Sequence, residues 1–451
     1  MRGKFEAPRQ KFSQPSSSQH PKREGATPYP RQAPSAPQSR RTDAASAPQA
    51  RRAVPAAAQQ PRREPTNTQQ PRRADAAPVR QTRKAAPAFA APAQPARRPQ
   101  YRKPTIGDYL LRTLAVLLTV VAVLAGTLLL SMKMICGSTS PSAKRTFVTT
   151  LLETGQMKFL VSWFVPADEV QQIVNSNSMA QIDDDVNANL ISVGTPEGGS
   201  TADSGKDLEV FDISGRTYSG KLIKVRDPSR ISLATIYPWR DIGVTLEELV
   251  QQSGALAAIN GGIYDSTNNT GGRPYGIIVS NGEIQHNKPN EWPGLVLVGF
   301  DEDNILQIIN VDGMSAAQTE ALIREKRIRD AVTFQEESSD ANNHFVQLII
   351  NGNPRGMSGA GSGLNPRTAI GQCADGSVLL LVTDGRGKNG HLGASAADLI
   401  EIMTQYGAVN AANLDGGSST CMYYDGQYLM TSVTFYYSNS SWKLPAGFIV
   451  K

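Results

Sequence analysis

The chain has 451 residues, with 46 Lys and Arg, 40 Asp and Glu, and three cysteines. Its charge is unevenly divided, because residues 1–105 hold 22 basic and 5 acidic side chains, whereas the rest of the chain holds 24 and 35. The net positive charge therefore does not predict a nucleic-acid-binding surface on the acidic C-terminal part. The three cysteines exclude a disulfide framework and have the wrong spacing for a zinc site. A single bridge between Cys373 and Cys421 and a pair of buried thiols both stay open.

The first 105 residues repeat Pro, Gln, Ala, Ser and paired arginines, and they contain 18 of the 29 prolines. Such a segment has too few large apolar side chains to offset the entropy lost on folding, so we expect it to be disordered. Its arginine pairs favour a solvated basic tail, and the alternative is a tail that contacts anionic lipid or cytoplasmic partners. No specific nucleic-acid partner is expected.

The next segment is strongly apolar. Residues 114–130 carry no charge and lie between Arg112 and Lys133. This length predicts one transmembrane helix, within residues 106–135. Basic residues are much denser before the helix than after it, so the tail is expected in the cytoplasm and the C-terminal part outside the cell membrane. The prediction is thus a single-pass protein with a signal-anchor.

The remaining chain divides into a helical stalk and flexible linker at 136–209 and a folded domain at 210–451. Helical periodicity extends over 147–173, and residues 182–207 are rich in Asp, Gly, Ser and Thr, as in a linker. Strands are expected at 210–213, 218–225, 231–236, 256–259, 277–280, 283–284, 295–300, 305–309, 346–350, 368–372 and 378–382, and helices at 246–252, 316–329 and 395–406. The Asn281-Gly282 pair is typical of a hairpin turn. Because strands outnumber helices, we predict an α+β fold with a mixed, mainly antiparallel sheet and flanking helices.

Three loops of this domain share one design, an apolar strand followed by Asn or Asp and then glycine. They are Asn260-Gly261-Gly262, Asp384-Gly385-Arg386 and Asn413-Leu414-Asp415-Gly416-Gly417-Ser418. Glycine lets the backbone approach a bound group closely, and the neighbouring hydroxyls and amides suit an anion or a sugar. We expect the three loops to converge on one site. The alternative is that each Asp or Asn only caps its own turn.

Four ordered blocks resemble the phosphodiester glycosidase family: AINGGIYD (258–265), PYGIIVSNGEI (274–284), NPRTAIGQCADGSVLLLVTDGR (365–386) and GASAADLIEIMTQYGAVNAANLDGGSST (393–420). The resemblance extends over about half of the chain. It implies hydrolysis of sugar-1-phosphodiesters, here in cell-envelope glycans or exopolysaccharide. Family members usually carry three glycines after the Asp of the last block, whereas Ser418 follows Gly417 here.

This chemistry requires a carboxylate near the anomeric carbon and donors around the departing phosphate. We expect Asp415, Asp384 and then Asp265 to supply the carboxylates. Arg367, which matches the family motif, and Arg386 are expected to bind the phosphate; the alternative for either is an ion pair with a neighbouring Asp. The other expected substrate-binding residues are Asn260, Gly261, Gly262, Thr368, Asn413, Gly416, Gly417 and Ser418. The glycine-rich run at 359–363 is a second candidate cradle for phosphate. His391 is either a proton-transfer group or a surface histidine.

No cofactor is predicted, and a divalent cation held by the Asp and Asn loop tips stays an open alternative. The main alternative to an enzyme is a non-catalytic envelope protein that binds glycan or acts as a scaffold. Asp415→Asn separates the two, since an enzyme loses turnover while a binder changes only in affinity.

Overall fold

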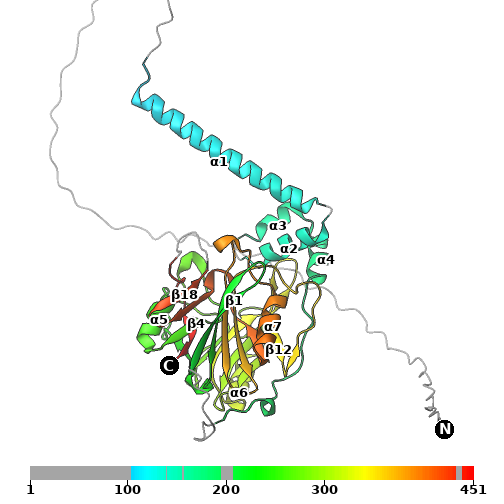
Figure 1. Cartoon of the computed structure of the whole chain (residues 1–451), viewed down its shortest axis with the longest axis vertical. Helices are drawn as coiled ribbons and strands as arrows, with labels where there is room; N and C mark the ends of the chain where they lie inside the picture. The colour runs from blue at the N-terminus through cyan, green and yellow to red at the C-terminus, as the bar shows by residue number, and fades with distance from the viewer. Residues whose placement is uncertain (1–102, 139, 155–156, 195–206, 433–438) are drawn as a thin grey trace, which may run out of the picture. The chain divides into compact units, whose positions relative to one another are not determined.

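The computed structural model describes residues 103–138, 140–154, 157–194, 207–432 and 439–451. The chain divides after Arg98, and every described residue belongs to the C-terminal unit. The predicted tail lies outside the described residues, except for its last three positions. Figure 1 shows a long helix, a group of shorter helices and a domain built mainly of strands.

The long helix is α1 (Ile106–Cys136), whose start is fixed by a capping box between Thr105 and Asp108. It is long and apolar enough to cross a membrane, and its apolar side chains are largely exposed. The helices that follow are α2 (Pro141–Leu152), α3 (Phe159–Phe164) and α4 (Ala167–Asn175). Their buried faces form one hydrophobic cluster with Met132 and Cys136 at the end of α1. The predicted helical stalk is thus a small packed helical group.

The domain contains three larger sheets, and every strand pairing among the described residues is antiparallel. The seven-stranded sheet has the order β1 (Leu208–Ser214), β2 (Ser219–Val225), β15 (Val378–Thr383), β14 (Arg367–Cys373), β16 (Ala408–Asn413), β12 (Gln347–Ile350) and β13 (Asn353–Pro354). One five-stranded sheet has the order β18 (Gln427–Thr431), β17 (Cys421–Tyr424), β4 (Ala257–Asn260), β19 (Ala446–Val450) and β3 (Ile231–Thr235). The other has β6 (Glu283–Asn287), β5 (Ile277–Ser280), β9 (Ile328–Gln335), β7 (Leu295–Asp301) and β8 (Leu306–Asn310). A short pair, β10 (Glu337–Ser338) and β11 (Asn343–His344), completes the strands.

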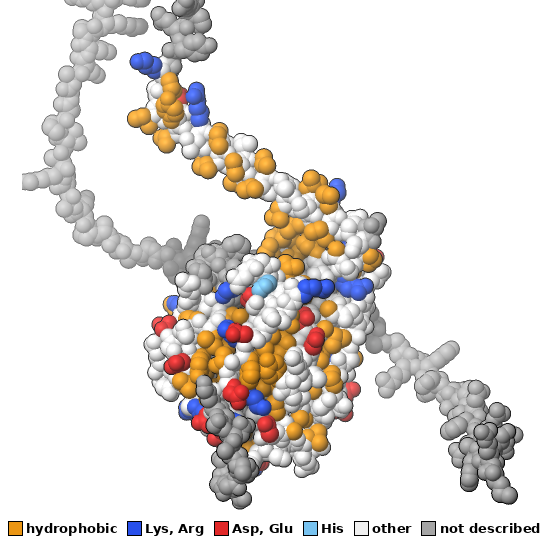
Figure 2. Space-filling model, in the orientation of Figure 1, with side chains coloured by type: hydrophobic (Ala, Val, Ile, Leu, Met, Phe, Trp, Pro, Cys, Tyr) orange, Lys and Arg blue, Asp and Glu red, His pale blue; other side chains and the backbone are white. Residues whose placement is uncertain are grey.

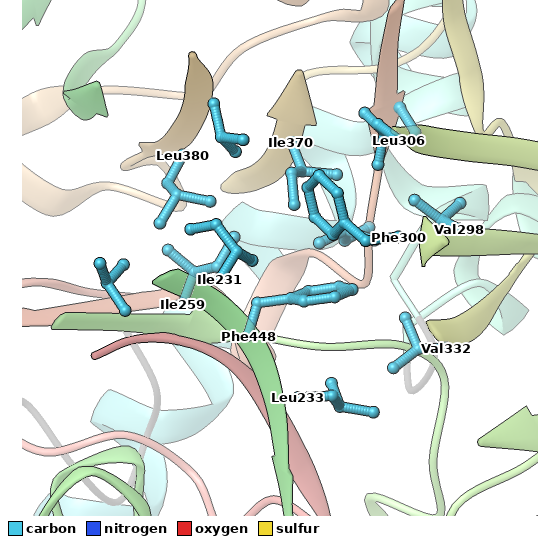
Figure 3. Close-up of a cluster of buried hydrophobic side chains, with 14 of the residues drawn as sticks. Ile231, Leu233, Ile259, Val298, Phe300, Leu306, Val332, Ile370, Leu380 and Phe448 are labelled. Carbon is cyan, nitrogen blue, oxygen red and sulfur yellow. The ribbon is translucent and has the colours of Figure 1, made fainter. Parts of the chain in front are cut away.

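Side chains from all three large sheets meet in one central core (Figure 3). Phe448 and Ile259 come from one five-stranded sheet, Phe300 from the other, and Ile370 from the seven-stranded sheet. The rings of Phe300 and Phe448 meet edge to face, with centroids 6.4 Å apart. Three helices cover outer surfaces of the sheets: α5 (Leu246–Ser253), α6 (Ala316–Glu325) and α7 (Ala396–Gln405). The α+β class and the mainly antiparallel pairing are therefore confirmed.

Two parts of the prediction were wrong. The helix expected at 316–329 ends at Glu325, because Arg327 takes a left-handed backbone conformation (φ 52°) and strand β9 begins at Ile328. The first half of the segment expected as a flexible linker lies on the domain. Asn187 N–H donates to Asn351 Oδ1 at 2.7 Å, and the Ser192 N–H donates to the carbonyl of Ala374 at 2.8 Å. Positions 195–206 of that segment lie outside the described residues.

Candidate active site

Strand register brings the predicted loops to one end of the seven-stranded sheet. Thr383, the last residue of β15, pairs with Arg367, the first residue of β14, and Asn413 at the end of β16 pairs with Ala369. The loops that follow β15 and β16 therefore leave the sheet where β14 enters it. The Gly417 N–H donates to the carbonyl of Pro366 at 2.8 Å, which ties the last loop to the start of β14.

The end of β4 joins this point from the neighbouring sheet through Asn260. Its Nδ2 donates to the carbonyl of Asp415 at 2.6 Å, and its Oδ1 accepts from Thr368 Oγ1 at 2.7 Å and from the Cys421 N–H at 3.2 Å. Asn260 is 1% exposed. Its side chain thus braces three segments against one another and has little surface left for a ligand.

Asp415 is partly exposed and lies where the seven-stranded sheet meets the five-stranded sheet that contains β4. Burial among protein atoms raises the pKa of its carboxyl to about 7, while the Ser419 hydroxyl, the Gly416 N–H and Arg386 act in the opposite direction. Ser419 is itself held by the buried Tyr264 hydroxyl at 3.0 Å. A carboxyl with a pKa near neutrality is suited to proton transfer in either direction at physiological pH.

Arg386 is the cation beside Asp415. Its Nη1 donates to Ser418 Oγ at 2.7 Å, and its Nε donates to Asn365 Oδ1 at 3.4 Å. Burial, and then the nearby Arg367, lower the pKa of the guanidinium to about 10, so it stays charged at neutral pH. The residue has a φ of 54°, a backbone conformation that side chains other than glycine seldom adopt and that is often found at functional sites.

The glycine and serine beside Arg386 have separate roles in placing it. A Cβ on Gly417, whose φ is 61°, would lie 2.5 Å from Arg386 Nη2, so only glycine fits there without displacing the guanidinium. Ser418, where the sequence departs from the family pattern, supplies the hydroxyl that holds the same side chain. The two predicted residues thus act on the guanidinium from the backbone and from a side chain.

Arg367 has entirely different surroundings. It is 5% exposed and forms an ion pair with Glu153 of the segment after α2, whose side chain is 1% exposed. The guanidinium also donates to the carbonyl of Gly363 at 2.8 Å and stacks on the ring of Phe345, 4.8 Å from its centroid. Arg367 thus forms an ion pair, as the alternative expected, but its partner is Glu153, some 200 positions earlier in the chain, and not a neighbouring Asp.

The carboxylate of Glu153 is saturated with donors. Besides Arg367, it accepts from the Gly363 N–H at 2.7 Å, from Asn365 Nδ2 at 3.1 Å and from Asn343 Nδ2 at 3.2 Å. The glycine-rich run that was expected to hold a phosphate therefore receives a carboxylate of the protein. A Cβ on Gly363 would lie 2.3 Å from the backbone N of Thr150, so this loop packs directly on α2.

Asp384 is 1% exposed and forms a pair with His391. Its Oδ2 lies 2.8 Å and its Oδ1 3.0 Å from His391 Nδ1, and Oδ1 also accepts from the Ser219 N–H at 2.7 Å. The His391 side chain is 25% exposed. The carboxylate fixes the orientation of an imidazole that reaches solvent. Of the two interpretations that the sequence allowed for His391, this favours a candidate proton-transfer group over an ordinary surface histidine.

Asp265 and Asn413 lie in less distinctive surroundings. Asp265 is partly exposed, and its Oδ1 caps the N–H of Thr267 at 3.0 Å. Asn413 is 1% exposed and donates to the carbonyl of Phe345 at 2.9 Å, while its buried Oδ1 has no hydrogen-bond partner. Gly261 accepts from the Asp415 N–H at 3.3 Å, and a Cβ on Gly262 would lie 2.2 Å from the carbonyl of Thr333. These glycines allow close packing of the loops.

Within the described part of the chain, no group of three or more His, Cys, Asp or Glu side chains is arranged to hold a metal ion. The three cysteines are free and buried. Sequence reasoning missed Glu153 and the Tyr264–Ser419 pair. Glu153 lies outside every block that carries the family resemblance, so no local signal pointed to it, whereas Tyr264 and Ser419 both lie within quoted blocks.

Residues 253–451 match the family model described as phosphodiester glycosidase, which confirms the resemblance seen in the sequence. The chain is 22% identical over 253 residues to the N-acetylglucosamine-1-phosphodiester alpha-N-acetylglucosaminidase of Mus musculus, which covers 52% of this chain and 45% of the mouse protein. It is 37% identical over 65 residues to the SPbeta prophage-derived uncharacterized protein YomE of Bacillus subtilis strain 168; the match covers 14% of this chain and 10% of YomE. The chain thus spans less than half the length of either relative.

Two solved structures are similar to parts of the chain. The catalytic domain of the zebrafish N-acetylglucosamine-1-phosphodiester alpha-N-acetylglucosaminidase, auto-inhibited by its pro-peptide, is 20% identical with a TM-score of 0.40, covering 56% of this chain and 85% of that one. A protein from Synechocystis is 16% identical with a TM-score of 0.36, covering 54% and 62%.

Proposed function

Residues 253–451 form a domain of the phosphodiester glycosidase family, and on that premise we propose that the protein is a membrane-anchored hydrolase of sugar-1-phosphodiester linkages in extracytoplasmic glycans. The observation that carries the proposal is the placement of Asp415 and Arg386 in neighbouring loops, close enough for each to influence the charge of the other. A carboxyl with a pKa of about 7 lies beside a charged guanidinium that is already oriented by Ser418.

The reaction breaks the bond between the anomeric carbon and the phosphate oxygen. Water attacks the anomeric carbon and gives a proton to the ionised Asp415, while the bonding electrons leave with the phosphate monoester. Arg386 stabilises the charge on the departing phosphate, which is a good leaving group and needs little help from a general acid. Asp384 acts through His391, whose imidazole it orients. Asp265 follows Tyr264 in the sequence, and the Tyr264 hydroxyl lies 3.0 Å from that of Ser419. We therefore assign Asp265 to the rim of the site.

The proposed anchoring is supported by α1, an apolar helix long enough to span a bilayer that precedes the matched residues 253–451. We assign the cytoplasm to the N-terminal side because Lys and Arg are concentrated there. The substrate would then be a phosphodiester-linked sugar of the cell envelope or of exopolysaccharide.

The test uses the full-length protein in detergent with a GlcNAc-1-phosphodiester and with the corresponding glucose and galactose compounds. Release of sugar by the wild type and not by Asp415→Asn supports the proposal. Binding of these compounds without release by either protein would instead favour the glycan-binding alternative.

A further inference from the structure

An exposed apolar patch lies on the helical group between α1 and the domain. Met157, Phe159 and Trp163, which we call the aromatic foot, are 39%, 50% and 63% exposed. The rings of Phe159 and Trp163 meet edge to face, with centroids 5.2 Å apart. On the opposite side of α3, Leu160 and Val161 are buried, so the helix is packed by one face and leaves the other uncovered by described residues.

The packed face of α3 ties the foot to the end of α1. Leu160 and Val161 share a hydrophobic cluster with Met132 and Cys136, the residues of α1 that are buried. In Figure 2, hydrophobic side chains run along α1 and gather where it reaches the following helices. The helix that carries the foot therefore packs against the C-terminal end of α1.

The position of this contact along α1 sets the depth of the foot in a membrane. The uncharged run of α1 ends at Leu130, so Met132 and Cys136 lie about 3 and 9 Å further along the axis at 1.5 Å per residue. The polar interfacial layer on each side of the hydrocarbon core is about 5–7 Å thick. Met132 thus lies within this layer and Cys136 just beyond it, so a helix that packs on both is expected at the outer part of the layer. Trp is enriched there because its ring is apolar while its indole N–H can still donate.

We infer that the aromatic foot inserts into the interfacial layer of the bilayer that α1 spans, as a second contact with lipid. The inference rests on the proposed membrane anchoring. Lipid is the occupant because the patch is carried by a helix that packs on α1 just beyond the end of its uncharged apolar run. The foot is also joined to the domain, since Lys158 Nζ donates to Asn342 Oδ1 at 3.1 Å and Glu153 binds Arg367. Its insertion would therefore fix the orientation of the candidate active site relative to the membrane surface.

The experiment uses full-length protein in nanodiscs whose phosphatidylcholine carries bromine either near the carbonyl groups or near the chain ends. Bromine quenches tryptophan fluorescence at short range, so quenching reports depth. The chain has four Trp residues, and the contribution of Trp163 is the difference between the wild type and Trp163→Phe. Trp292→Phe is the matched control, because Trp292 packs against Tyr275 in the domain, with ring centroids 5.6 Å apart.

The expected result is that shallow bromines quench the Trp163 contribution at least twofold more strongly than deep bromines. In the control, the fluorescence lost on Trp292→Phe should show no such difference between shallow and deep bromines. A Trp163 contribution that is unquenched at both depths overturns the inference, because the ring then lies in water or against protein and not in lipid. Stronger quenching by deep bromines also overturns it. Failure of the chain to enter nanodiscs overturns the anchoring itself. Hydrolysis of a soluble diester by Trp163→Phe is expected to equal that of the wild type, which separates the inference from the proposed chemistry.

Discussion

Two arginines near the same sheet end differ in what surrounds their guanidinium groups. Arg367 is enclosed by Glu153, backbone carbonyls and the ring of Phe345, and its ionic partner is itself 1% exposed. Arg386 contacts the Ser418 hydroxyl and lies beside Asp415, whose carboxyl has a pKa of about 7. The sequence predicted both as phosphate ligands. Arg367 joins the helical group to the domain, while the proposed function assigns the substrate phosphate to Arg386.

The largest expected effect concerns the carboxylate beside Arg386. Asp415→Asn removes the group proposed to accept the proton of water, and loss of a general base lowers kcat by about 10²–10⁴-fold. Substrate affinity should stay within a few-fold, because the amide has the same shape. Sugar release and equilibrium binding measured on the same protein check both parts. Asp265→Asn is the comparison variant, and an equal loss of kcat in that protein would contradict the assignment.

The buried ion pair of Arg367 predicts that removal of its partner, Glu153, lowers the stability of the protein. Glu153→Ala leaves a buried guanidinium without its counter-ion, and breaking a buried pair in this way costs about 3–5 kcal/mol. Thermal unfolding of the full-length protein measures the change. Glu169→Gln is a matched control in the same helical group, since Glu169 pairs with Lys144 while 39% exposed. A loss below about 1 kcal/mol is expected there. Equal stability of the two variants would show that Glu153 is no structural tie.

Arg386→Lys tests the proposed role of Arg386 in binding the substrate phosphate. Lysine keeps the charge but loses the planar, two-pronged donor, so kcat/KM should fall about 10–100-fold without a comparable change in unfolding temperature. Arg324→Lys on α6 is the control, because that arginine is 75% exposed and pairs only with Glu320 on the same helix. If Arg386→Lys lowers stability as much as Glu153→Ala does, the contrast between the two arginines fails.

The predictable parts of this molecule are those encoded by neighbouring residues. The Asn281-Gly282 turn forms as expected, with φ of 52° and 77°, because both residues tolerate the left-handed conformation that a tight hairpin needs. The loop after β16 was recognisable as a candidate site for the same reason, since Asp415, Gly416 and Gly417 are consecutive. The end of helix α6, before β9, could not be predicted in this way. Arg327 adopts a conformation that its residue type does not favour, and only the pairing of β9 with β7 accounts for it.

The roles of the two arginines depend on contacts made across long stretches of chain. Arg367 stands in a motif that pointed to substrate, yet its partner comes from position 153, before the domain that the sequence delimited. Residue type could not separate it from Arg386, because an arginine suited to a phosphate is equally suited to a buried carboxylate. Knowing which loop α2 packs against was necessary, and that depends on tertiary packing.

The smallest expected effect is the dependence of activity on pH. Burial raises the pKa of Asp415 from its ordinary value near 4 to about 7, so the carboxyl is mostly protonated below pH 7 and cannot accept a proton from water there. We therefore expect kcat/KM to rise about tenfold from pH 6 to neutrality and above, then level off. Arg386 stays charged throughout this range, because its pKa is about 10. A profile that instead falls as pH rises through 7 would make the protonated Asp415 the active form, and its role would change from base to acid.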